Sequence, residues 1–352
     1  MVNGISLFSN IGIDETYFQD YGVNIVLANE LLEKRCAFYK YLYPNVNMIC
    51  GDITDSDIFN NLVKLYKKYN CNFLIATPPC QGMSQAGKMD KNDIRNRLII
   101  DTIKFIKNTL PDNIIIENVP QILKFSILLN NKEIKIIDFI NDELKPLGYF
   151  VNYSILDAAD YNTPQYRKRA IFLISKITKW EFPKKHKYIT VEQAIGDLPS
   201  LNSGESSPIP YHYAKKHKKE HIKWMSHTPT GKSAFDNPVY FPQKNRRKIK
   251  GFKTTYKRID WDRPAPTITM CNGAISSQNN VHPGRLLDNG LYSDARVLSI
   301  LELIRLTGLP DNWNIPVWAS DNFIRQVLGE AFPPKFACCM LTTMPNKGIK
   351  ND

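Results

Sequence analysis

The stretch ISLFSNIGIDETYFQDYGVNIVLANE, residues 5–30, sets the pattern that decides the fold. Residues 5–8 and 24–28 are short apolar runs with β-branched side chains, as is typical of buried strands. Residues 14–20 between them are expected to form a helix. A strand, a helix and a second strand in this order predict two parallel strands joined by a crossover helix.

The same alternation continues through the first half of the chain. Further strands are predicted at residues 48–50, 73–77, 113–117, 149–156 and 170–174, and further helices at residues 31–42, 56–69, 95–109 and 131–145. The predicted fold class is therefore α/β, a doubly wound and mainly parallel sheet, with a hairpin at one edge because only a short segment joins the last two strands. In such sheets ligands bind beyond the carboxyl ends of the strands.

The composition limits the class of protein. The chain has 352 residues, 43% hydrophobic and 23% charged, which is typical of a globular protein with one large or two ordinary domains. No apolar run reaches the ~18 residues of a transmembrane helix and no signal peptide is recognisable, so an intracellular protein is expected. The seven cysteines include no CxxC pair and no zinc spacing, so neither a disulfide framework nor a metal site is expected.

The positive charge is concentrated in one segment. Residues 181–258 hold 17 lysines and arginines against 6 aspartates and glutamates, a net charge of +11, while the whole chain carries +12. Aromatic residues are interleaved among these basic residues. Such a segment is either a solvated surface or a surface that binds nucleic acid, and the combination of charge and aromatics favours nucleic acid.

Three consecutive strand ends carry residues suited to an adenosine-containing cofactor. Gly12 lies in a tight turn after the first strand, although the glycine-rich run of a typical nucleotide site is missing. Glu30 follows the second strand, where a carboxylate can accept both ribose hydroxyls. Asp52 and Ile53 follow the third strand and offer an acid beside an apolar neighbour for an adenine ring. Either acid alone would more often be a helix cap or a surface residue, but the three strand ends together predict the cofactor.

Later strand ends carry candidate catalytic residues. Cys80 lies in TPPCQGMS (77–84), where two prolines fix the turn, and it is predicted to be a nucleophile rather than an inert core thiol. Glu117 ends the fifth strand and is predicted to act as an acid, the alternative being a helix cap. In QYRKR (165–169), strand alternation would place Gln165, Arg167 and Arg169 on one face.

These motifs and several later ones resemble the motifs of the C5-cytosine DNA methyltransferases, specifically the prokaryotic type II restriction-modification enzymes. The resemblance rests on PPCQGMS (78–84), IIIENVP (114–120), QYRKR (165–169), RPAPTIT (263–269), VHPGR (281–285), LSILELIRLTGLPDNW (298–313) and GEAFPPKFA (329–337). It spans nearly the whole chain, and its motifs are specific in combination. It implies a Rossmann-like methyltransferase domain dependent on S-adenosylmethionine, with a smaller target-recognition domain.

The resemblance also implies a mechanism and a set of contacts. Cys80 would add to C6 of a flipped-out cytosine, Glu117 would protonate N3, and Arg167 and Arg169 would hold the base and the nearby backbone. The implied substrate-binding residues are Gln81, Ser84, Gln165, Arg246 and Arg247. The implied cofactor-binding residues are Phe8, Ser9, Asn10, Ile11, Gly12, Glu30, Leu31, Asp52, Ile53, Pro78, Leu98, Glu330 and Ala331. The product would be S-adenosylhomocysteine, and no metal is implied.

The chain departs from the family pattern at a few positions. Asn10 and Ile13 stand where the family usually has glycine, Leu31 where it commonly has an aromatic residue, and Glu330 where it usually has asparagine. Met83 stands where Phe or Trp is common. These departures leave the catalytic set intact and are expected to bear on cofactor affinity.

The resemblance predicts three parts: a catalytic and cofactor-binding domain at 1–175, a basic target-recognition domain at 176–315, and a C-terminal helix packing back on the catalytic domain at 316–352. The expected partner is double-stranded DNA, with a cognate restriction endonuclease encoded nearby. A monomer in the cytoplasm of a prokaryote, or encoded by a phage, is expected. Three alternatives stay open: a tRNA cytosine-5 methyltransferase, a catalytically silent DNA-binding homologue, and a nicotinamide dehydrogenase suggested by the fold alone.

Overall fold

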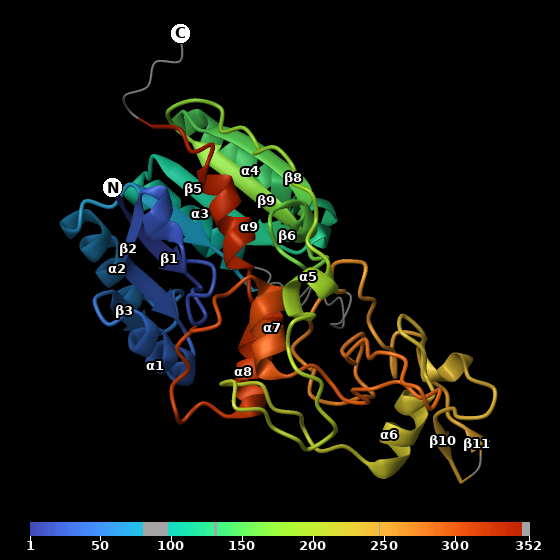
Figure 1. Ribbon diagram of the computed structural model, residues 1–352. Coiled ribbons are helices and arrows are strands. Elements are labelled where there is room, and N and C mark those ends of the chain that lie inside the picture. The colour runs from blue at the N-terminus through green and yellow to red at the C-terminus, as the bar shows by residue number, and fades with distance from the viewer. Residues whose placement is uncertain (80–97, 130–131, 246, 347–352) are drawn as a thin grey trace. The chain divides into compact units, whose positions relative to one another are not determined.

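The computed structural model describes residues 1–79, 98–129, 132–245 and 247–346 (Figure 1). The chain divides into two compact units. The first unit comprises Met1–Asp157, Lys168–Lys185 and Phe336–Asp352, and the second comprises Ala158–Arg167 and His186–Lys335. The three-part division expected from the sequence stays a prediction.

A seven-stranded sheet forms the centre of the first unit. Its strands, in spatial order, are β3 (Asn47–Cys50), β2 (Val23–Glu30), β1 (Val2–Leu7), β4 (Phe73–Ala76), β5 (Asn113–Asn118), β9 (Lys168–Ser175) and β8 (Phe150–Asp157). The first five run parallel, whereas β9 is antiparallel to both β5 and β8. The predicted mainly parallel sheet with an edge hairpin is therefore confirmed.

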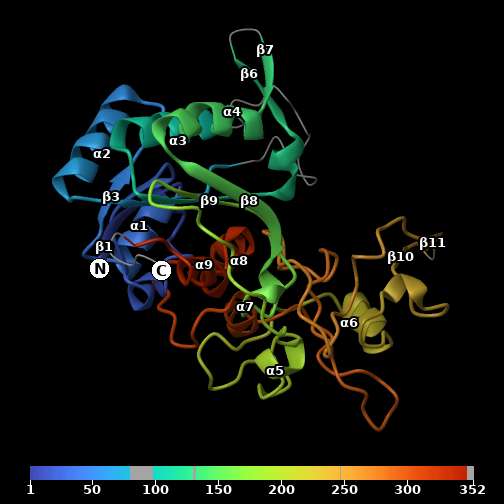
Figure 2. The same cartoon turned by 90° about the horizontal axis from the view of Figure 1, so that it is seen from above.

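Helices cover both faces of this sheet, as Figure 2 shows. On one face α2 (Ser56–Lys68), α3 (Leu98–Thr109) and α4 (Ile136–Leu144) contribute side chains to the main hydrophobic core. On the other face α1 (Glu33–Leu42) packs against β2 and β3. The alternation of strand side chains serves both layers, because neighbouring residues of β2 enter different cores.

The helix expected at residues 14–20 is wrong. Only a short 3₁₀ helix, η1 (Phe18–Tyr21), forms there. The preceding turns are closed by bonds between residues three apart, such as Phe18 N–H to the Glu15 carbonyl at 3.0 Å. Buried Asp14 and Glu15 side chains fix this segment, and the spacing of apolar residues did not reveal them.

The helix expected at residues 131–145 begins later than predicted. Residues Lys132–Lys135 form β7, which pairs with β6 (Ser126–Leu129) in an antiparallel hairpin, and α4 starts at Ile136. Ile127 is buried in the core directly opposite Ile134, which explains why strand pairing prevails over helix formation there.

The second unit consists mainly of irregular segments. Its helices and strands are α5 (Val191–Ile195), α6 (Lys219–Ser226), β10 (Gln243–Lys244), β11 (Arg247–Lys248), α7 (Ile300–Thr307) and α8 (Asp321–Glu330), and α9 (Pro334–Leu341) begins in it and continues into the first unit. A small core holds it together, in which Trp224 and Tyr256 pack with Ile275 and Val281. At least two aromatic residues of the basic segment therefore serve internal packing.

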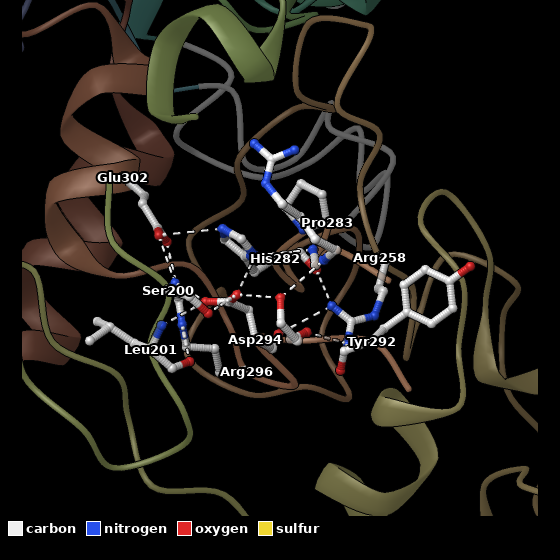
Figure 3. Close-up of polar contacts among 12 residues, drawn as sticks. Ser200, Leu201, Arg258, His282, Pro283, Tyr292, Asp294, Arg296 and Glu302 are labelled. Atoms are coloured by element: carbon white, nitrogen blue, oxygen red, sulfur yellow. Dashed lines mark hydrogen bonds and ion pairs between the residues drawn. The ribbon is translucent and has the colours of Figure 1, made fainter. Parts of the chain in front are cut away.

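Two fully buried arginines connect the loops of the second unit (Figure 3). The Arg258 guanidinium donates to the carbonyl oxygens of Met225 at 3.0 Å, of His282 at 2.8 Å and of Ser293 at 2.8 Å. Each of these segments lies more than 20 residues from Arg258 in sequence. A single side chain thus donates hydrogen bonds to a carbonyl group near the end of α6 (Lys219–Ser226) and to carbonyl groups of two irregular segments.

The second arginine forms an ion-pair network. Arg296 donates to Glu302 at 2.8 and 2.9 Å and to Asp294 at 2.8 Å. Asp294 also accepts hydrogen bonds from Ser200 Oγ at 2.6 Å and Leu201 N–H at 2.9 Å. Glu302 in turn caps α7, because its carboxylate accepts the Ser299 N–H at 2.7 Å.

Acid is expected to destabilise the second unit through this network. Burial lowers the pKa of His282 to about 4. Burial alone would raise the pKa of Glu302, but Arg296 and His282 lower it to about 2. Both groups bind protons more readily in the unfolded chain, so each stabilises the folded state at pH values above its unfolded pKa. The stabilisation from His282 is lost as the pH falls from about 6.5 towards 4, and that from Glu302 as the pH falls from about 4.5 towards 2.

Thermal unfolding followed by tryptophan fluorescence measures this effect. We expect a loss of roughly 2 kcal/mol between pH 7 and pH 4.5. A His282→Gln variant should remove only part of this dependence, because burial also lowers the pKa of His217, in the same unit, to about 4. A melting temperature that stays constant from pH 7 to pH 4.5 in the wild-type chain would contradict the assignment.

Within the part of the chain that the structure describes, no helix combines the length and apolar composition needed to cross a membrane. Over the same residues, no three Cys, His, Asp or Glu side chains gather as they would around a metal ion.

Candidate active site

The topology brings five strand ends to one edge of the sheet. Because β3, β2, β1, β4 and β5 are parallel neighbours, the residues that follow them line the same edge. Most predicted site residues of the first unit that the structure describes end or follow these strands; Leu98 lies at the start of α3, and Arg169 lies near the start of the antiparallel strand β9. The strand order also changes direction between β1 and β4, which is where such sheets bind ligands.

The loop after β1 has an unusual backbone. Phe8, Asn10 and Gly12 adopt left-handed φ angles of 57°, 50° and 76°. For a bulky residue such as Phe8 this conformation costs on the order of 1–3 kcal/mol and persists only where surrounding contacts impose it. Ser9 N–H donates to the Asn29 carbonyl at 3.0 Å and Asn10 N–H to Glu30 Oε2 at 3.0 Å, so β2 holds the loop in place.

Glu30 is the central acid of this edge. Its carboxylate is buried and accepts the N–H groups of Asn10 and Leu32, each at 3.0 Å. Burial raises the pKa of Glu30, and these hydrogen bonds oppose the rise. Leu31 and Leu32 directly after it are 58% and 47% exposed. A buried acid next to exposed apolar side chains can bind a ribose and cover one face of a base.

The neighbouring predicted cofactor residues differ in exposure. Asp52 is exposed and its Oδ1 accepts the Thr54 N–H at 2.9 Å. Ile53, by contrast, is 3% exposed and belongs to the main core. Pro78 is buried, and its carbonyl accepts the Asn118 side chain at 3.0 Å. Leu98 is partly buried against the core.

Glu117 and Arg169 form an ion pair at the carboxyl end of β5. Arg169 Nε lies 2.7 Å from Glu117 Oε1, and the two side chains are only 15% and 11% exposed. The pairing of β5 with β9 places them on adjacent strands. Because Asn118 also anchors Pro78, the segment leading to residue 80 and the strand bearing Glu117 are held together. Cys80, Gln81 and Ser84 lie outside the described residues.

Gln165 and Arg167 belong to the second unit rather than to a strand. Since β9 begins at Lys168, the predicted alternation does not extend to them. Both are buried. Gln165 Oε1 accepts the Ile268 N–H at 3.1 Å, and Arg167 donates to the carbonyls of Ile268 and Gly329, each at 3.1 Å. Through these hydrogen bonds, the two side chains connect the backbone around Ile268 and Gly329 within the second unit.

The remaining predicted residues also lie in the second unit. Glu330 ends α8 and accepts the Gln326 side chain at 3.3 Å, and Ala331 follows it in a buried position. Arg247 is exposed on β11, while Arg246 lies outside the described residues.

Sequence reasoning missed a cluster that holds the loop after β1. Tyr43 Oη donates to the Gly12 carbonyl at 2.6 Å, and Tyr39 Oη donates to Glu15. The two rings lie so close to Gly12 that an added Cβ would be 2.6 and 2.7 Å from them. Glycine is thus required there for both its φ angle and its space. The signal in the sequence is the pair of tyrosines four residues apart, one helical turn.

Two buried acids belong to the same cluster. Burial raises the pKa of Glu15 to about 7. Burial, followed by the nearby Glu15 and more weakly by Glu117, raises the pKa of Asp14 well above its usual value. The loop therefore rests on carboxyl groups that are largely neutral in mildly acidic solution.

Comparisons of sequence connect the chain with known proteins. Residues 2–344 match the family described as C-5 cytosine-specific DNA methylase. The chain is 52% identical over 340 residues to the Type II methyltransferase M1.HgaI of Avibacterium volantium, with 95% of each protein covered. It is 30% identical over 342 residues to the Type II methyltransferase M1.HphI of Haemophilus parahaemolyticus, covering 95% of this chain and 84% of that protein.

Solved structures show the same architecture. A protein encoded within an Escherichia coli prophage superposes with a TM-score of 0.70 at 19% identity, covering 97% of this chain and 98% of that one. DNMT2 of Spodoptera frugiperda, solved as a triple mutant, superposes with a TM-score of 0.65 at 16% identity, covering 97% of this chain and 99% of that one. At these identities the likeness concerns the fold.

Proposed function

This chain belongs to the C-5 cytosine-specific DNA methylase family, and on that premise we propose that it methylates C5 of a specific cytosine in double-stranded DNA with S-adenosylmethionine. The observation that carries the proposal is the Glu117–Arg169 pair at the ligand edge of the sheet. An acid held by an arginine beside the strand end that leads to Cys80 has the arrangement needed to activate a cytosine.

The residues around Glu30 fit the proposed cofactor. S-adenosylmethionine supplies a methyl group on a sulfonium centre. Glu30 would accept the ribose hydroxyls, for which its buried carboxylate has acceptor capacity beyond the two backbone N–H groups. Exposed Leu31 and Asp52 would contact the adenine, while the loop Phe8–Gly12 would receive the methionine end. Ser9, Ile11, Ile53, Pro78, Leu98, Glu330 and Ala331 keep their proposed cofactor role from the resemblance alone.

The chemistry assigns one task to each catalytic side chain. The Cys80 thiolate adds to C6 of the cytosine, which moves an electron pair onto the N3 side of the ring. Glu117 gives its proton to N3 and so neutralises that charge. After the methyl group is on C5, loss of the C5 proton to water expels the Cys80 thiolate, and the N3 proton returns to the Glu117 carboxylate, which restores the neutral ring. A duplex buries these atoms, so the base must leave the stack first.

The two arginines are proposed to differ in role. Arg169 orients Glu117 through the 2.7 Å contact and, as the family resemblance implies, would meet the O2 side of the same base. Arg167 is a positioning residue, since its guanidinium donates to the backbone of Ile268 and Gly329. Gln165 supports the same backbone.

The basic segment is proposed to bind DNA through those cations that are not engaged internally. Lys215 pairs with Asp321 at 2.8 Å, Lys248 donates to the Phe235 carbonyl at 2.8 Å, and Arg258 is buried. Lys244 and Arg247 are exposed on the small hairpin of β10 and β11. They are the candidates for phosphate or guanine contacts, together with Arg246, Gln81 and Ser84, which rest on the resemblance alone.

Tyr43→Phe is expected to raise the KM for S-adenosylmethionine about three- to tenfold with little change in kcat. The variant removes the hydroxyl that donates to the Gly12 carbonyl and so loosens the proposed cofactor loop. Steady-state kinetics with varied cofactor measure the effect. Tyr41→Phe, which alters an exposed tyrosine of the same helix, is the matched control. Equal KM values in both variants would contradict this role for Tyr43.

Calorimetric titration with S-adenosylmethionine, followed by methylation assays on DNA and tRNA, tests the proposal. Cofactor binding with methyl transfer to DNA supports it. No binding at millimolar cofactor, or transfer to tRNA alone, contradicts it. A bacterial or phage cytoplasm, a monomeric state and a restriction endonuclease encoded nearby complete the proposal, and the Type II methyltransferase names of the relatives support the last.

A further inference from the structure

Two thiols that the proposed chemistry does not use lie against the backbone of Glu30 and Leu31. Cys36 Sγ donates to the Glu30 carbonyl at 3.3 Å. Cys50 Sγ lies 3.8 Å from the Leu31 carbonyl, within reach of a weak hydrogen bond from sulfur. Each thiol therefore supports a carbonyl group in the segment that carries the central acid of the site.

The fold brings these two thiols together. Cys50 ends β3 and is the direct register partner of Glu30 in β2. Cys36 lies in the first turns of α1, where its N–H bonds to the Leu32 carbonyl at 3.0 Å. Both side chains belong to the cluster between α1 and the sheet, and their sulfur atoms lie against the carbonyls of two consecutive residues, Glu30 and Leu31.

The two thiols differ in environment. Cys50 is partly exposed, whereas Cys36 is 3% exposed, and burial raises the pKa of Cys36. An oxidant therefore meets Cys50 first, and Cys36 lies behind it in position to complete a disulfide.

The other described cysteines lack such a partner arrangement. Cys71 is buried and Cys271 is exposed in the second unit. Cys338 and Cys339 are consecutive residues of α9, so their side chains point about 100° apart and an unstrained disulfide cannot join them.

We propose that Cys36 and Cys50 form an oxidisable dithiol site that a hydroperoxide closes to a disulfide, weakening cofactor binding at Glu30. The second half of this inference rests on the proposed cofactor role of Glu30. In the first step the Cys50 sulfur attacks the peroxide, the O–O bond breaks, and a sulfenic acid and an alcohol (or water) form. In the second step the Cys36 sulfur displaces the sulfenic hydroxyl, which leaves as water with the thiol proton.

Disulfide formation changes the support of Glu30 in two ways. Both S–H donors to the Glu30 and Leu31 carbonyls disappear. The sulfur atoms also approach to about 2.05 Å, which draws the start of α1 towards the end of β3. The N–H of Leu32, which Glu30 accepts, belongs to the residue directly before α1 and would move with the start of that helix. We therefore expect the dissociation constant for S-adenosylmethionine to rise about tenfold, as when a hydrogen bond of a carboxylate is weakened.

The experiment uses the full chain with Cys80→Ser and Cys271→Ser, which removes the proposed nucleophile and the exposed thiol. The protein is treated with hydrogen peroxide, digested with trypsin and examined by mass spectrometry. Trypsin releases Cys36 in peptide 36–40 and Cys50 in peptide 41–64. Calorimetry then compares S-adenosylmethionine binding in the reduced, oxidised and dithiothreitol-treated protein, with Cys50→Ser added as the control variant.

The inference predicts peptides 36–40 and 41–64 joined, with the mass of a disulfide, and cofactor affinity that falls on oxidation and returns with dithiothreitol. The Cys50→Ser variant should show neither change. Overoxidation of Cys50 without crosslinking would overturn the dithiol site, and a disulfide with unchanged affinity would overturn its link to the cofactor. If reduced protein does not bind S-adenosylmethionine at all, the proposed function fails, while the joined peptides still decide whether the dithiol site exists.

Discussion

Glu117→Gln should lower the rate of DNA methylation by about 10²–10⁴-fold. Glutamine retains an oxygen that can accept from Arg169, so the geometry of the 2.7 Å contact is largely kept. It has no acidic proton to give, and the charge that Cys80 addition places on the N3 side of the cytosine then stays uncompensated. The loss should therefore appear in kcat rather than in the KM for the cofactor.

Single-turnover methylation of a DNA substrate measures this prediction. Glu143→Gln is the matched control, because Glu143 pairs with Lys107 on the surface of the first unit at 2.5 Å. The control should keep nearly full activity. A Glu117→Gln variant with wild-type kcat would exclude Glu117 as the acid. A lower melting temperature accompanying the loss of activity would point to a structural role instead.

Arg296→Met should destabilise the second unit by about 3–5 kcal/mol. The variant leaves the carboxylates of Asp294 and Glu302 buried without their shared cation. Since Asp294 also holds Ser200 and Leu201, and Glu302 caps α7, the damage should spread through the loops that the network connects.

Urea unfolding followed by tryptophan fluorescence measures the loss. Arg305→Met is the control, because Arg305 pairs with Asp197 and Asp311, which are 66% and 54% exposed. Exposed pairs of this kind contribute about 0–1 kcal/mol each. If the two variants unfold at the same urea concentration, the buried network is not what stabilises this unit.

The strands of the sheet were predictable because local sequence decides them. Residues 114–116, for example, are three consecutive isoleucines, and such an apolar β-branched run is typical of a strand buried on both faces of a sheet. The parallel direction of most strands followed from their alternation with helices. Placing Glu30 and Glu117 at the ligand edge followed from the same reasoning, since both end parallel strands.

The missed features depend on contacts between residues far apart in sequence. The segment 14–20 has the spacing of a helix, but Tyr43 holds the left-handed Gly12 just before it and Tyr39 holds the Glu15 side chain. The Glu117–Arg169 pair spans 52 positions and exists because β9 returns beside β5. Likewise, Arg258 reads as one more cation of the basic segment, and only the fold shows that it is buried among carbonyl groups. The number of basic residues in a segment cannot distinguish a buried arginine such as Arg258 from basic side chains that would contact DNA.

The most direct test incubates the wild-type protein and Cys80→Ser with S-adenosylmethionine and unmethylated plasmid DNA, then maps 5-methylcytosine by bisulfite sequencing. The proposed function predicts methylation confined to one short sequence motif with the wild-type protein and none with Cys80→Ser. Undiminished methylation by Cys80→Ser would contradict covalent catalysis, and no methylation of DNA by a wild-type protein that binds the cofactor would contradict DNA as the substrate.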